Sequence, residues 1–316
     1  MSKGGLMAKH IALIVLAVSI LNPSAFADDL PKDLLEKPKS FSYFAIGSEH
    51  INYKESISVG GANFETDTSA NNTVLLSGGR TFVSRESSFS INAISTLFPN
   101  HVDETWKLTN TILGPADLDG DGSADPGATQ VYEPQTVQTN RFTYSRVSTQ
   151  FLFHYHPDLW WSVDVGATYS LGTFKRFSFN YNDVLVCDTA QRDCSGNTVV
   201  EETFGEFSIQ AGGSIHFPLT QNTLLRLSVL GGMPLFSRIE NSLYPDLDFD
   251  STSGWHTEII SSLMYKLTSD ISLGFVHDFQ YHFKKQQHKT SNQVAVYIPE
   301  NVRIANRFGL VGSWSF

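Results

Sequence analysis

The sequence lacks the long apolar runs of a helical membrane protein. Beyond residue 27, no segment comes near the about 20 apolar residues that a membrane-crossing helix needs, and the mean hydropathy is only −0.14. Basic residues are also few, with 22 Lys and Arg against 32 Asp and Glu and a net charge of −10. A chain this acidic offers no basic surface to phosphates, which argues against nucleic acid as a partner.

The one apolar run is short and stands at the N-terminus. Lys3 and Lys9 precede the apolar residues 11–21, and Ala25-Phe26-Ala27 follows them. A cationic start, a short apolar core and an A-x-A site predict a secretory signal peptide over residues 1–27, with a short membrane anchor as the alternative. We therefore expect a chain exported by a bacterial cell, in which residues 28–40 form a periplasmic segment.

Cysteine is almost missing from this exported chain. The two present, Cys187 and Cys194, have six residues between them. In an oxidising compartment that spacing suits a small loop closed by a disulfide. Two free thiols remain the alternative, because spacing alone does not establish a bond.

What the chain has in abundance is alternation with a period of two residues, which is typical of strands with unlike faces. In one such run, Trp161, Val163 and Val165 alternate with Ser162 and Asp164. The other clear runs cover residues 146–156, 205–217, 225–235, 255–266 and 272–284, and fainter ones cover 41–51, 73–83 and 89–98. A polar average with 12 % aromatic residues fits a sheet whose two faces differ in polarity.

The connections between these runs alternate in length. Brief polar turns occupy residues 84–87, 157–159, 219–222 and 268–270, and long polar stretches occupy 52–71, 99–138, 175–202, 238–253 and 285–300. This layout is typical of outer-membrane barrels, whereas a soluble β-sandwich, the alternative, need not sort its loops by length. Over residues 41–316 we predict an all-β fold: a transmembrane antiparallel up-and-down β-barrel of about ten strands with long extracellular loops. Eight or twelve strands stay open.

The chain ends on an alternating run with an aromatic last residue. The apolar side chains of this run are Phe308, Leu310, Trp314 and Phe316. It resembles the final strand of bacterial outer-membrane β-barrel proteins. The resemblance implies an outer-membrane location, recognition by the barrel-assembly machinery, and contact with membrane lipid and lipopolysaccharide. Asn306 and Gly312 depart from the apolar pattern, and Asn306 fits it if this residue lies near the outer interface.

The opposite faces of the runs carry charges of both signs. The predicted lumen-facing set is Arg80, Arg146, Asp164, Glu206, Arg226, Glu258, Lys266, Asp278, Arg303 and Arg307. With about ten strands, the interior lies at the border between a filled core and an open channel. We expect a narrow passive pore for ions or small polar solutes. The alternative is a non-conducting barrel with a structural or surface-interaction role, similar to an autotransporter barrel without its passenger.

The longest polar stretch, residues 99–138, holds the clearest local motif and is strongly acidic. Its candidate calcium ligands are Asp117, Asp119, Asp121, Ser123 and Asp125. Their spacing matches the first part of an EF-hand-type calcium loop, although Ala128 stands where that loop has Glu. We expect calcium to bind weakly, at about 0.1–1 mM, with a solvated acidic loop as the alternative.

No catalytic constellation stands out in the sequence. Outer-membrane phospholipases and lipid A deacylases place Ser two positions after His, and no His of this chain is followed in that way. Omptin proteases resemble the chain in size and expected strand number. No acidic pair matches the omptin motif, so no catalytic residue is carried over, and an omptin-like or lipid-modifying enzyme is the least expected function.

Overall fold

The computed structural model describes residues 39–119, 123–158, 160–182, 196–250, 252–291 and 294–316. The predicted signal peptide, Cys187, Cys194 and Asp121 lie outside the described residues. Among the described residues, no helix is long and apolar enough to span a membrane.

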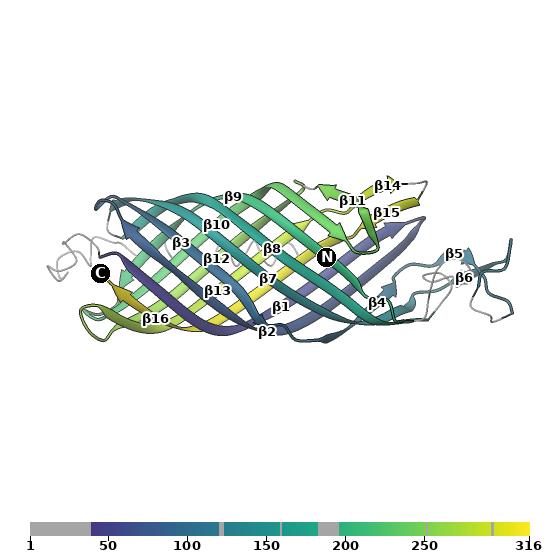
Figure 1. Ribbon diagram of the computed structural model, residues 1–316, viewed down its shortest axis with the longest axis horizontal. Coiled ribbons are helices and arrows are strands. Elements are labelled where there is room, and N and C mark those ends of the chain that lie inside the picture. Colours follow the sequence, from purple (N-terminus) through teal and green to yellow (C-terminus); the bar gives the residue numbers. More distant parts are fainter. Residues whose placement is uncertain (1–38, 120–122, 159, 183–195, 251, 292–293) are drawn as a thin grey trace. The chain divides into compact units, whose positions relative to one another are not determined.

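Ten strands form a closed antiparallel ring (Figure 1), which confirms the predicted fold class. They are β1 (Phe41–Val59), β2 (Ala62–Phe82), β3 (Ser87–Phe98), β7 (Gln135–Asp158), β8 (Trp161–Tyr181), β9 (Val200–Pro218), β10 (Thr223–Asn241), β12 (Gly254–Lys266), β13 (Ile271–Lys284) and β16 (Glu300–Ser315). Each pairs with its neighbours along the chain. The pairing of β1 with β16, from Phe41↔Ser315 to Ser56↔Glu300, closes the wall. Closure satisfies the backbone without a free edge, as hydrocarbon requires.

The four short turns lie where the sequence predicts them. They join β2 to β3, β7 to β8, β9 to β10 and β12 to β13. Because Phe41 pairs with Ser315, both described ends of the ring lie at this short-turn end. In outer-membrane barrels that end faces the periplasm.

At their described residues, the long polar stretches hold more strand than loop, which corrects the expectation of loops throughout them. Residues 52–71 form a continuous hairpin of β1 and β2, turned by Gly60 and Gly61. Both glycines have positive φ, 58° and 89°, which a two-residue hairpin turn favours. The stretches 99–138, 238–253 and 285–300 hold β4 (Val102–Leu108), β5 (Ile112–Pro115), β6 (Thr129–Tyr132), β11 (Tyr244–Asp250), β14 (Gln287–Ser291) and β15 (Val294–Ile298).

The outer face of the ring carries an apolar belt beside the short turns. On β7, Val147, Phe151 and Tyr155 point outward and are about half exposed. Farther from the short turns the apolar residues change face: Phe142 and Tyr144 point inward and are 1 % exposed. The change of face follows from the surroundings, because the outer wall meets lipid in the belt and water beyond it.

The same change of face recurs around the ring and marks where the wall leaves the membrane. On β1, Phe44 and Ile46 point outward, whereas Ile51 and Tyr53 point inward and are buried. We call the wall beyond this level the crown. On six strands of the ring, the first outward-facing polar side chain beyond the belt is that of His50, Asn71, Arg141, Lys175, Thr203 or Arg238. Asn306 pairs in register with His50, so it lies at the outer edge of the belt.

Candidate functional site

The interior of the barrel gathers most of the chain's buried polar groups. All ten lumen residues predicted from the sequence lie on the inner face. Of these, Arg80, Arg146, Asp164, Glu206, Glu258, Asp278, Arg303 and Arg307 are buried, Arg226 is half-buried and Lys266 is exposed at the short-turn end. These groups are organised in layers along the barrel.

The layer nearest the short turns centres on Asp164 of β8. Asp164 Oδ1 accepts a hydrogen bond from Ser162 Oγ at 2.7 Å and lies 2.6 Å from His154 Nδ1, and the second carboxylate oxygen accepts from Ser214. His154 Nε2 is 2.8 Å from Ser90 Oγ. These Ser–His–Asp contacts could not be predicted from the sequence, because the three residues come from three different strands. None of these three residues is more than 5 % exposed, so we interpret their contacts as packing rather than as catalysis.

The middle layer centres on Arg307 of β16. Its guanidinium donates from Nε to Glu49 and from Nη1 to Asp278, each at 2.6 Å. Glu258 accepts hydrogen bonds from Gln150 at 2.6 Å and from Gln280 at 2.5 Å. The bonds of Arg307 to Glu49 and Asp278 link the strands β16, β1 and β13 inside the lumen.

At the outer edge of the belt, Glu206 contacts the Lys284 ammonium and the His282 imidazole. It lies 2.8 Å from Lys284 Nζ and 3.2 Å from His282 Nε2. Asp278 and His282 share a strand and a face, as do His256 and Glu258, but the described contacts of these residues go to other partners. The structure therefore brings together no His–carboxylate couple from either of these pairs.

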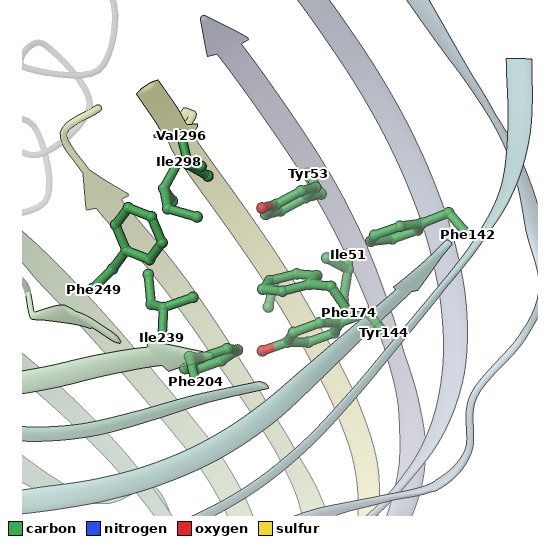
Figure 2. Close-up of a cluster of buried hydrophobic side chains, with 11 residues drawn as sticks. Ile51, Tyr53, Phe142, Tyr144, Phe174, Phe204, Ile239, Phe249, Val296 and Ile298 are labelled. Atoms are coloured by element: carbon green, nitrogen blue, oxygen red, sulfur yellow. The ribbon is translucent and has the colours of Figure 1, made fainter. Parts of the chain in front are cut away.

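Farther from the short turns than these layers lies a cluster of buried aromatic and aliphatic side chains, which we call the plug (Figure 2). Its members are Ile51, Tyr53, Phe142, Tyr144, Phe174, Phe204, Ile239, Phe249, Val296, Ile298 and Ala305. Phe174 lies at its centre, with ring centroids 4.7 Å from Tyr53, 4.8 Å from Tyr144 and 5.4 Å from Phe204. Gly172 makes room for the Phe204 ring, since a Cβ there would lie 2.3 Å from it. These rings come from different strands and fill the bore from several sides.

On the outer side of the plug, a charged cluster in the crown surrounds Arg176 of β8. Arg176 donates from Nε to Glu104 at 2.7 Å, bonds Glu55 through Nη2, and lies 3.6 Å from Glu202. One cation thus faces three carboxylates. Desolvation by burial, opposed by the charge of Arg176, raises the pKa of Glu55 to about 7.

The raised pKa of Glu55 predicts a crown that becomes more stable in mild acid. The unfolded pKa is 4.5, so the folded state binds the extra proton between about pH 7 and 4.5. Stability therefore rises as the pH falls through that window and drops as the pH climbs through 7. We expect the melting temperature to rise by a few degrees from pH 8 to pH 5.5.

Glu55→Gln should flatten this pH dependence, because the variant no longer titrates. Glu65→Gln is the matched control, since Glu65 lies on the outer face of the neighbouring strand β2 and its side chain is 45 % exposed. The measurement is thermal unfolding followed by tryptophan fluorescence. A Glu55→Gln barrel that keeps the wild-type profile would contradict the assignment.

The acidic motif of the long polar stretch forms a compact group at its described positions. Ligand oxygens of Asp117, Asp119 and Asp125 all lie within 4.8 Å of one another. Asp125 Oδ2 also accepts the backbone N–H of Leu118 at 2.7 Å, which holds the loop closed. Three carboxylates at this separation can present oxygens to one hard cation.

Comparison with known proteins reveals similarity at the level of structure alone. No protein-family model and no curated protein matches the sequence. The outer-membrane protease OmpT from Escherichia coli matches with a TM-score of 0.58 and 10 % identity, over 89 % of this chain and 97 % of that chain. The translocator domain of the autotransporter NalP from Neisseria meningitidis gives 0.33 and 8 %, over 99 % and 98 %, and a Pseudomonas aeruginosa FadL homologue gives 0.33 and 8 %, over 92 % and 93 %.

The likeness to OmpT concerns the fold and nothing finer, because the identity is so low. The fold is that of bacterial outer-membrane β-barrels, as the final strand indicated. A closed wall with an apolar belt is built for a bilayer. The protein is therefore an outer-membrane barrel, and its specific activity has to be argued from its own residues.

Proposed function

We propose that this chain is a sealed outer-membrane barrel that acts through its crown and not as a conduit. The observation that supports the proposal is the plug, which packs rings from β1, β7, β8 and β9 across the bore (Figure 2). Tyr53, Phe142 and Tyr144 are each at most 2 % exposed, so little water reaches them. A conducting path needs a continuous line of solvated polar groups, and the plug interrupts it.

The charged layers on either side of the plug also favour a filled bore. Arg307 bonds two carboxylates, and Arg176 bonds two and approaches a third. Charges engaged in this way are held by their partners and are not offered to passing ions. The narrow pore expected from the sequence is therefore the second candidate. Its support is that a barrel of about ten strands is at the border between a filled core and an open channel.

The outer face of the crown suits the sugars and phosphates that lipopolysaccharide presents just outside the membrane, which supports lipopolysaccharide as a partner. On β8, Phe177 pairs in register with the outward-facing Arg141, so it lies on the outer face as well. Arg141 lies 5.9 Å from the Phe177 ring, and Lys175 is exposed beside it. Aromatic faces pack against sugar rings, and the two cations suit phosphates.

Solute-driven swelling of vesicles tests the sealed barrel. Vesicles that carry the folded protein should keep their volume when a small sugar or amino acid is added outside. Vesicles with a known porin serve as the positive control, and heat-modifiable migration on a gel verifies that both barrels are folded. Swelling at a rate that depends on solute size would refute the proposal and favour the narrow pore.

Calcium binding by the acidic group is a separate proposal with its own expected result. Isothermal titration should show binding at about 0.1–1 mM, the range of weak extracellular calcium modules. Asp119→Asn should weaken it at least tenfold, because one of three clustered carboxylates is lost. Asp67→Asn, on the exposed outer face of β2, should leave it unchanged. Absence of heat at millimolar calcium would overturn the proposal.

A further inference from the structure

Two arginines near the short turns have no carboxylate partner. Arg80 on β2 lies against the His154 ring, with Nη2 3.2 Å from Nε2 and 3.3 Å from Nδ1. Arg226 on β10 donates one long hydrogen bond, to Ser214 Oγ at 3.4 Å. Neither guanidinium forms a salt bridge with any residue that the structure describes, whereas Arg307 and Arg176 hold carboxylates at 2.6 and 2.7 Å.

Several buried nitrogens of these arginines and of the neighbouring His216 make no hydrogen bond to any residue that the structure describes. Nε of Arg80, Nε of Arg226 and Nε2 of His216 have no hydrogen-bond partner within the described part of the chain. Arg226 and His216 are direct cross-strand partners on β10 and β9, and both face the lumen. A buried donor without an acceptor costs about 1–3 kcal/mol, so these unpartnered nitrogens indicate a missing acceptor.

The local charge is also out of balance. Arg80 contacts His154 and Arg226 contacts Ser214, and both His154 and Ser214 bond the same carboxylate, that of Asp164. Its oxygens are already engaged by His154, Ser162 and Ser214. Two guanidinium groups against one occupied carboxylate leave an excess of one positive charge, which a low-dielectric interior does not tolerate without a counter-ion.

We propose that Arg226, His216 and Arg80 form an anion site that takes a phosphate-class oxyanion from the short-turn end of the barrel. Arg226 and His216 are half-buried rather than sealed, and they stand close to the Pro218–Thr223 turn, which places them near the periplasmic mouth. A guanidinium fork matches two oxygens of one oxyanion, and an imidazole N–H reaches a third. This site is independent of the sealed bore, because the plug lies farther along the barrel.

Isothermal titration of the folded barrel with inorganic phosphate tests the site. The full barrel is kept in an uncharged detergent without phosphate groups, and the ionic strength is held constant with sodium chloride. We expect saturable binding with a Kd on the order of 1 mM, typical of one small ion on a few contacts. Arg226→Gln should weaken it at least tenfold. Arg238→Gln, on the outer face of the same strand with its side chain 48 % exposed, should bind as the wild type does.

A thermal shift provides the second readout and guards against misfolding. Phosphate should raise the melting temperature of the wild type and of Arg238→Gln, but not that of Arg226→Gln. Without phosphate, Arg226→Gln should be no less stable than the wild type, because it removes a charge that has no ion-pair partner. Absence of saturable heat with the wild type, or equal binding by Arg226→Gln, would overturn the proposal.

Discussion

Replacing Arg307 by Met should destabilise the barrel by about 3–5 kcal/mol, the cost of leaving buried charges without their partner. Arg307 is 1 % exposed and holds Glu49 and Asp278 at 2.6 Å, so its removal strands two carboxylates. Urea unfolding in micelles, followed by tryptophan fluorescence, measures the loss. Arg141→Met is the control, since Arg141 points outward from the crown and is exposed.

A rescue experiment separates the charge effect from lost packing. In the Arg307→Met background, Glu49→Gln and Asp278→Asn together should recover most of the lost stability, because the stranded charges disappear. If the triple variant is as unstable as the single one, the Arg307 layer contributes through shape and not through its ion pairs. Arg307→Lys should recover little, since an ammonium cannot reproduce the fork that bridges two carboxylates.

Phe174→Ala should cost about 3–5 kcal/mol, the range for truncating a buried Phe to Ala. The ring of Phe174 lies against four other aromatic rings of the plug at centroid distances from 4.7 to 6.0 Å, so its removal leaves a cavity that the rigid wall cannot close. Phe177→Ala, three residues farther along β8 on the outer face, should cost less than about 1 kcal/mol. Equal losses for the two variants would show that the plug is not a packed core.

The alternation of side chains predicted the wall because one property, the polarity of each face, fixes strand, register and orientation together. Trp161, Val163 and Val165 face outward as expected, and the four short turns are where the pattern breaks. The ring of ten strands followed from counting connections. This reasoning could not distinguish a polar strand from a polar loop, because polar residues such as Lys54 and Asp67 are common in both.

A signal for the crown was nevertheless present. On β7 the apolar positions move from the odd residues, such as Val147 and Phe151, to the even residues Phe142 and Tyr144. Such a change of phase within one alternating run indicates where the wall passes from lipid to water. It would also have identified the plug, because apolar side chains on the inner face must pack against one another.

The contacts across the lumen lay beyond the reach of the sequence. Arg176 meets Glu55 and Glu104 from strands far apart in the chain, and strand order alone does not set which inner side chains stand at the same height. That height depends on the tilt and stagger of the strands. The Ser90–His154–Asp164 chain and the unpaired Arg226 escaped prediction for the same reason.

Single-channel recording across a planar bilayer tests the sealed bore most directly. The folded wild-type barrel, with its insertion verified by antibody or protease access from one side, should give no current steps under applied voltage. A double variant, Phe174→Ala with Phe204→Ala, should give small steps if it folds, because it thins the plug from two sides. Regular steps carried by the wild type, of the same size with or without the plug residues, would contradict the account.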